Sequence, residues 1–179
     1  MNDSPYSDTL IEWAAMAGLS LSFYDGIWVL ADLGGEIRYY LHSTDVHTLT
    51  QAERGDPESF LVSAVNITDI ERYLMNSWES TIRYRRSLPY ISSDPLPLQA
   101  CDIAPGYSLR EVEPGKAAIV SSDGTVRVII RGDTTSTAFI PVWFSYILDA
   151  SLKDLRASFL DPDGLPLFPG CKIGPSRTS

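Results

Sequence analysis

The pattern of hydrophobic and polar positions at the start of the chain is helical and then changes to the alternation typical of strands. A helix is expected to begin at Ser7 or Asp8, either of which would cap it, and to end at Gly18. Apolar positions recur between these limits three or four residues apart, so they share one helix face. That predicted face consists of Leu10, Trp13, Ala14 and Ala17.

Tight turns then separate runs of residues that predict strands. Asp25-Gly26 is a strong hairpin signal, and Gly34-Gly35 marks a second turn. The first 41 residues are therefore expected to form one helix and a three-stranded meander, and two further strands would extend the same sheet. The expected strands of this half cover residues 19–23, 27–30, 36–41, 47–52 and 60–65.

A second helix is expected after these strands and should pack across the sheet. Thr68 and Glu71 stand three positions apart, as in a capping box, which predicts that the helix begins at Thr68. The apolar positions that follow again share one face. They are Ile70, Tyr73, Leu74 and Trp78.

The second half of the chain begins after a proline-rich connection. Because Asp94-Pro95-Leu96-Pro97 does not suit a helix interior or a central strand, residues 92–105 are interpreted as a surface connection and a candidate subregion boundary. The apolar segment 138–148 fits either a helix that begins near Pro141 or a buried strand, and we favour the helix. Strands are expected at 107–112, 117–121 and 125–131, and a helix at 151–159.

Together these elements predict an α+β fold. A largely antiparallel sheet, built from hairpins, would pack against several helices, and residues 1–179 would form a single domain. The tryptophans fall on predicted apolar faces, so core packing explains them more simply than a ligand cage does. They are Trp13, Trp28, Trp78 and Trp143.

The charge of the chain argues against nucleic acid as a partner. The 14 Lys and Arg against 23 Asp and Glu give a net charge of −9, whereas a protein that binds the phosphate backbone of a nucleic acid usually carries a basic surface. No run of apolar residues approaches the roughly 18 of a membrane span, and the N-terminus has no leader pattern. We therefore expect a cytoplasmic protein with neither a nucleic acid nor a membrane as its partner.

Residues that could carry out chemistry are few. His42, Asp45 and His47 are of metal-ligating types but lack a further ligand at a motif spacing, so exposed histidines are the favoured interpretation. Cys101 and Cys171 stand 70 positions apart, and two free thiols are favoured over a disulfide. Neither a nucleophile elbow nor a phosphate-binding loop is found. We expect no catalytic residues, no bound metal and no cofactor.

One basic cluster interrupts this acidic chain. Arg83, Arg85 and Arg86, with Tyr84 between them, could clamp an anion or stack on single-stranded nucleic acid. Ion pairing within the protein, or solvation, is the favoured alternative because the rest of the chain is acidic.

Four motifs together resemble a known family. They are the run Ala31 to Tyr40, which reads ADLGGEIRYY, then Ala52-Glu53-Arg54, Ile70 to Leu74, and Asp161 to Phe168. The chain is similar in these motifs to the immunity proteins of actinobacterial polymorphic toxins, specifically those like the immunity factor for tuberculosis necrotizing toxin.

The resemblance implies a non-catalytic antitoxin. Such a protein would bind a cognate secreted toxin domain, as a 1:1 heterodimer, and occlude an active site that hydrolyses NAD. An acidic surface is compatible with this role, since a site for a phosphate-rich dinucleotide tends to be positive.

The residues that would contact the toxin are predicted from the position of a turn. Because binding residues favour loops held on a rigid sheet, we expect partner contacts at Asp32, Gly34, Gly35 and Glu36. An ordinary hairpin turn is the alternative for these four residues.

Two other function classes stay open. A small-ligand-binding or accessory domain would contain an enclosed apolar pocket. An enzyme with an unrecognised site would need a titratable group with a perturbed pKa in a cleft.

Overall fold

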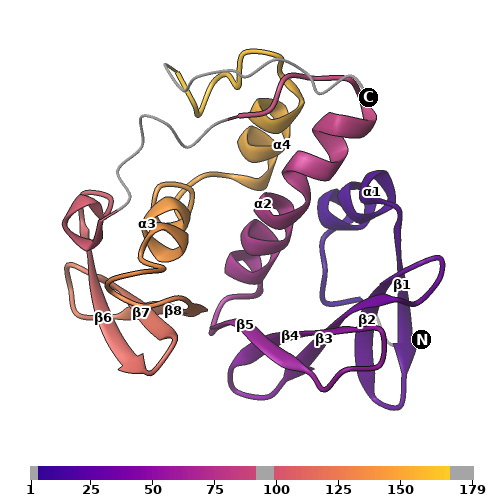
Figure 1. Cartoon of the computed structure of the whole chain (residues 1–179), viewed down its shortest axis with the longest axis horizontal. Helices are drawn as coiled ribbons and strands as arrows, with labels where there is room; N and C mark the ends of the chain where they lie inside the picture. Colours follow the sequence, from indigo (N-terminus) through magenta and orange to yellow (C-terminus); the bar gives the residue numbers. More distant parts are fainter. Residues whose placement is uncertain (1–3, 92–98, 170–179) are drawn as a thin grey trace.

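One antiparallel sheet of eight strands, covered by helices, organises the molecule (Figure 1). The computed structural model describes residues 4–91 and 99–169. The predicted α+β class, with a sheet built from hairpins, is confirmed. The strands are β1 (Leu19–Tyr24), β2 (Ile27–Asp32), β3 (Ile37–Ser43), β4 (His47–Glu53), β5 (Ser59–Ala64), β6 (Tyr107–Glu113), β7 (Lys116–Ser121) and β8 (Val126–Arg131). The helices are α1 (Asp8–Ala17), α2 (Ile67–Arg85), the short 3-10 helix η1 (Ala100–Asp102), α3 (Phe139–Ser145) and α4 (Leu152–Leu160).

Two meanders join at the middle of this sheet. The strand order is β1-β2-β3-β4-β5-β8-β7-β6, so β5 pairs with β8 even though α2 and two strands separate them along the chain. Val62 pairs with Ile130 and Ala64 with Val128 at this junction. Strands from before and after the proline-rich connection therefore share one sheet. Residues 92–98 of that connection lie outside the described residues.

Helix α1 begins and ends as the sequence predicts. Ser7 is the N-cap, and its side chain accepts a hydrogen bond from the Leu10 amide at 3.3 Å. Gly18 ends the helix with φ of +81°, a conformation that favours glycine. A Cβ at Gly18 would also lie 2.5 Å from Arg85 Nη1 on α2. This glycine therefore ends one helix and lets a side chain of another pack against it.

Helix α2 begins differently from the prediction. Its N-cap is Asn66, whose side chain accepts from the Thr68 amide at 2.9 Å, so the predicted capping box at Thr68 is wrong. Glu71 accepts a 2.6 Å bond from the Ser7 amide of α1 instead. Asn66 caps the helix because it stands one residue before the first helical position, and its short side chain places an amide oxygen beside the free backbone N–H groups of the first turn.

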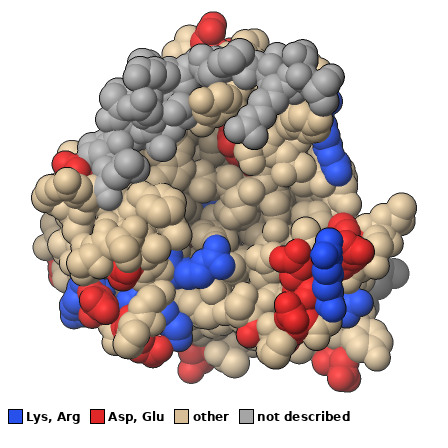
Figure 2. Space-filling view, viewed as in Figure 1, with Lys and Arg blue, Asp and Glu red and all other residues tan. Residues whose placement is uncertain are grey.

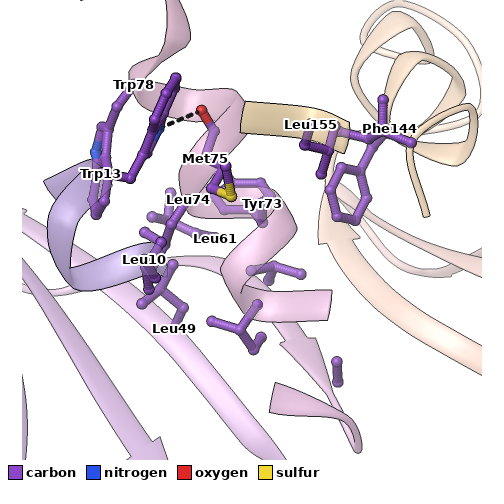
Figure 3. Close-up of a cluster of buried hydrophobic side chains, with 14 of the residues drawn as sticks. Leu10, Trp13, Leu49, Leu61, Tyr73, Leu74, Met75, Trp78, Phe144 and Leu155 are labelled. Carbon is purple, nitrogen blue, oxygen red and sulfur yellow. Dashed lines mark hydrogen bonds between the residues drawn. The ribbon is translucent and has the colours of Figure 1, made fainter. Parts of the chain in front are cut away.

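The core lies between this helix layer and the sheet. The apolar face predicted for α2 is buried, and Figure 3 shows it meeting Trp13 of α1 together with Leu49 and Leu61 of the sheet. The Trp13 indole donates to the Met75 carbonyl at 3.1 Å. Leu61 and Val62 are adjacent, yet both are buried, because the β4–β5 register shifts at this point and breaks the alternation of side chains.

Another register shift, between β7 and β8, lies at a half-buried charged side chain. Between β7 and β8, Ile119 pairs with Val128 and Val120 with Val126, so Arg127 has no partner residue opposite it. The Arg127 guanidinium lies 3.2 Å from the buried Asp69 carboxylate at the start of α2. This pair links the second meander to the helix that follows the first one.

Helices α3 and α4 confirm the favoured predictions for their segments. Helix α3 begins at Phe139, two residues before Pro141, which is accommodated because the first helical turn needs no amide donor. Ser151 caps α4 and accepts from the Asp154 amide at 3.0 Å.

The basic cluster at the end of α2 serves mainly to hold the fold together. Arg83 is fully buried and lies 3.4 Å from Glu79, one turn earlier. Arg85 donates to the Met16 carbonyl of α1 at 3.2 Å, and Arg86 is exposed. The expected pairing within the protein is therefore confirmed for Arg83. Its guanidinium donates to four carbonyls, those of Pro89 at 2.5 Å, Phe159 at 2.9 Å, Asp161 at 2.8 Å and Pro162 at 3.1 Å.

Replacement of Arg83 by Met should destabilise the protein strongly. Arg83→Met keeps most of the aliphatic volume but leaves four carbonyls and Glu79 without their partner, which should lower the free energy of unfolding by about 3–5 kcal/mol. Urea unfolding followed by tryptophan fluorescence measures the change. Arg86→Met is the control and should change stability by less than about 0.5 kcal/mol. Equal stability of the two variants would contradict this assignment.

Candidate functional site

The four residues predicted to contact a partner form the turn between β2 and β3. The Asp32 carboxylate accepts from the Ile37 amide at 3.0 Å, and the Gly35 amide donates to the Asp32 carbonyl at 2.9 Å. Gly35 has φ of +63°, a conformation that glycine adopts without strain. Asp32 and Gly35 thus hold the turn in shape. Gly34 and Glu36 are exposed on it.

The neighbouring turn between β4 and β5 packs beside this one, which sequence reasoning missed. The Arg54 amide donates to the Glu36 carbonyl at 2.7 Å, and the Arg54 and Glu36 side chains pair at 3.6 Å. The two turns lie side by side because β3 and β4 pair along their whole length, from Ile37 opposite Glu53 to Ser43 opposite His47. Only the register between β3 and β4 shows which residues of the β4–β5 turn contact the β2–β3 turn.

We call the joined region the turn surface. It carries five carboxylates and two guanidinium groups, a local net charge of 2 − 5 = −3, and at its tip the Leu33 side chain is fully exposed (103%). A depression of about 310 Å³ lies between the turns, bordered by residues that include Arg38, Tyr40 and Asp56. The turn surface consists of Asp32, Leu33, Gly34, Gly35, Glu36, Arg38, Tyr40, Glu53, Arg54, Asp56 and Glu58.

Glu58 at the edge of this surface is kept ionised by its neighbours. Partial burial acts to raise the pKa of Glu58, but hydrogen bonds from Thr50 and His42 outweigh it and bring the pKa below its usual value. His42 Nε2 lies 2.7 Å from the Glu58 carboxylate. This histidine therefore has a carboxylate partner.

The other groups considered for metal binding are dispersed. His47 contacts the Ser43 hydroxyl at 3.0 Å, and Asp45 lies exposed in the loop before it. Within residues 4–91 and 99–169, no group of three or more His, Cys, Asp or Glu is placed to hold a metal ion. Cys101 is an exposed free thiol, and Cys171 lies outside the described residues.

A cavity of about 300 Å³ opens among α2, α3, α4 and β8. Figure 2 shows it as the hollow at the centre of this face, with acidic and basic side chains gathered mainly below it. Its walls are mostly aromatic and aliphatic, with Asn76 and Glu79 as the groups that carry amide and carboxyl functions. The lining residues are Tyr73, Asn76, Glu79, Ile91, Ile130, Phe139, Ile140, Trp143, Phe144 and Phe159.

Burial dominates the ionisation of Glu79. It raises the pKa of this carboxyl from 4.5 to about 7, against the opposing effects of Arg83 and of the Ile91 amide. The Arg83 guanidinium is already engaged by four backbone carbonyls, and within residues 4–91 and 99–169 no donor bonds the buried Glu79 Oε1. Sequence reasoning missed this group because its position in a helix does not reveal how deeply it is buried.

The chain matches one family of known proteins over most of its length. The family described as Immunity protein 61 matches residues 13–167. The chain belongs to the Immunity protein 61 family.

Relatives of this Immunity protein 61 member include two mycobacterial proteins. The chain is 29% identical over 170 residues to the immunity factor for TNT of Mycobacterium tuberculosis and, to the same extent, to its homologue in Mycobacterium bovis BCG. Each alignment covers 90% of this chain and 92% of the relative. The expected family resemblance is therefore confirmed, and the chain is an immunity protein.

A solved structure agrees with this assignment. Rv3902c from M. tuberculosis superposes with a TM-score of 0.77 at 28% identity, which covers 92% of this chain and 94% of the other. Among the described residues, no helix is long and apolar enough to cross a membrane.

Glu79 should make this Immunity protein 61 member less stable as the pH rises from about 4.5 to about 7. The folded protein keeps a proton that the unfolded chain has released, so the stabilisation present below pH 4.5 is lost as the pH passes the folded-state pKa. The facing charge is Arg83, which in turn interacts with Asp161. The expected loss in the free energy of unfolding is about 3 kcal/mol.

Urea unfolding at several pH values between these limits tests this expectation. Glu79→Gln cannot ionise, so the wild type should lose stability relative to this variant as the pH rises. Glu12→Gln, at an exposed position, should follow the wild type. Parallel pH profiles for the wild type and Glu79→Gln would contradict the assignment.

Proposed function

We propose that this immunity protein binds a cognate secreted toxin domain that hydrolyses NAD and inhibits it by covering its active site. The observation that carries the proposal is the family match over residues 13–167, together with a relative named as the immunity factor for TNT. The complex would be a 1:1 heterodimer in the cytoplasm of the producing cell. The chain itself would be an inhibitor and not a catalyst.

The turn surface has the chemistry that such an inhibitor needs. A site that binds the phosphates of a dinucleotide tends to be positive, and carboxylates on an approaching partner would be steered to it and could replace the phosphates. The acidic groups of the turn surface flank Leu33, an exposed apolar side chain that could fill a pocket. We therefore propose the turn surface, with Asp32, Gly34, Gly35 and Glu36 at its centre, as the toxin contact.

Rigidity of the two turns supports the same choice. Asp32 accepts from the Ile37 amide, and Arg54 donates to the Glu36 carbonyl, so the backbone of each turn is held before a partner arrives. A preorganised surface loses little conformational entropy on binding, and that favours tight inhibition.

Substitutions on the turn surface should weaken inhibition of the toxin. Leu33→Asp removes the apolar tip and Glu36→Lys reverses a charge, and each is expected to raise the Kd for the toxin domain by about tenfold or more. The measurement is NAD consumption by the purified toxin domain, titrated with each variant. Co-purification followed by mass determination checks the stoichiometry.

Val65→Asp is the matched control. Val65 is also an exposed apolar residue (69%), but it follows β5 at the opposite end of the strand from the turn surface. This variant should inhibit as well as the wild type. If Val65→Asp weakens inhibition and the two turn variants do not, the contact lies elsewhere. If the wild type leaves NAD consumption unchanged, the proposed function is wrong.

A further inference from the structure

The cavity among α2, α3, α4 and β8 shares no residue with the turn surface. Its volume of about 300 Å³ is at the small end of the range of ligand sites, roughly 300–1,000 Å³, so it suits a molecule of one or two rings. Aromatic side chains from both α2 and α3 form its walls, among them Tyr73, Phe139 and Trp143. Such walls favour a flat apolar body in the ligand.

The first polar group in this cavity is an oriented amide. The Trp143 indole donates to Asn76 Oδ1 at 2.7 Å. This bond fixes the side chain of Asn76 and leaves its amide nitrogen without a hydrogen-bond partner among the described residues. Asn76 therefore offers a donor to a ligand acceptor such as a carbonyl oxygen.

The second polar group is the carboxyl of Glu79. Its Oε1 atom is buried with no hydrogen-bond donor among the described residues, and Arg83, 3.4 Å away, is engaged by backbone carbonyls. Burial raises its pKa to about 7, so below neutral pH the protonated carboxyl offers both a donor and an acceptor. A group with this capacity complements an N–H and a carbonyl on the same ligand.

The charges around the cavity select against ionic ligands. A cation would be repelled by Arg83 while Glu79 is protonated, and an anion would lose its hydration in this mostly apolar cavity and find the donors of Arg83 already directed to backbone carbonyls. A neutral ligand avoids both penalties, and an amide can satisfy Asn76 and Glu79 together.

From this arrangement we propose that the cavity binds a small neutral aromatic molecule that carries a carboxamide group. The ring would lie against the aromatic walls, its carbonyl would accept from Asn76, and its amide N–H would donate to Glu79. This site goes beyond the proposed toxin inhibition and does not depend on it, because the two surfaces are separate.

Three probes of similar shape and different charge test the proposal on the wild-type chain. Benzamide is neutral, benzoate is an anion and benzylamine is a cation. Titration at pH 6 would be followed by calorimetry and by the NMR signal of the Trp143 indole N–H. Benzamide should shift that signal and bind at least about tenfold more tightly than either ion. Equal binding of all three, tighter binding of an ion, or no binding of benzamide would overturn the proposal.

Variants of the two polar groups then locate the site. Asn76→Leu and Glu79→Leu should each weaken benzamide binding by about fivefold or more, whereas Glu79→Gln, which keeps a donor and an acceptor, should retain it. Thr81→Leu, on an exposed part of α2 outside the cavity, is the control and should bind like the wild type. Retained binding in both Leu variants would refute the assignment of the site.

The outcome is independent of toxin inhibition. The charge series uses the unmodified chain, so it remains decisive even if a variant fails to fold. Loss of NAD-hydrolase inhibition in Leu33→Asp bears only on the turn surface, and loss of benzamide binding in Asn76→Leu bears only on the cavity.

Discussion

The buried guanidinium of Arg83 holds the helical layer of this protein together. It donates to carbonyls in the segment after α2, at the end of α4 and in the segment after α4, so it joins helices α2 and α4 and the chain that follows each of them. A buried charge is costly unless its hydrogen bonds are satisfied, and backbone carbonyls satisfy this one. The position of α4, and with it one wall of the cavity, depends on this residue.

The same guanidinium explains why Glu79 behaves unusually. With its donors directed to carbonyls, Arg83 supplies attraction to Glu79 but leaves Oε1 without a good hydrogen bond. Desolvation of the carboxyl therefore exceeds the Coulombic gain, and its proton is retained near neutral pH. The binding of the Arg83 guanidinium by carbonyls thus both anchors the helices and leaves a protonated carboxyl at one end of the cavity.

The molecule presents two surfaces of opposite character. The turn surface is acidic, exposed and held by short-range backbone bonds, as suits contact with another protein. The cavity is mostly apolar and is made by side chains from several helices and a strand, as suits a small molecule. Both depend on the continuous sheet, which carries the turns at a strand end and supports the helices on its face.

The sequence by itself determined the local elements. The caps at Ser7 and Gly18 and the hairpin turns were predictable because their causes lie within a few residues of each other. The motifs of the family and the turn between β2 and β3 could be recognised in the sequence for the same reason. Only the tertiary structure decided the β5–β8 pairing, the second turn beside Glu36 and the burial of Glu79. It also decided the register shifts near Leu61 and at Arg127, which alternation along a strand does not reveal. These features arise from contacts between residues far apart in the chain, and a local sequence pattern does not predict such contacts.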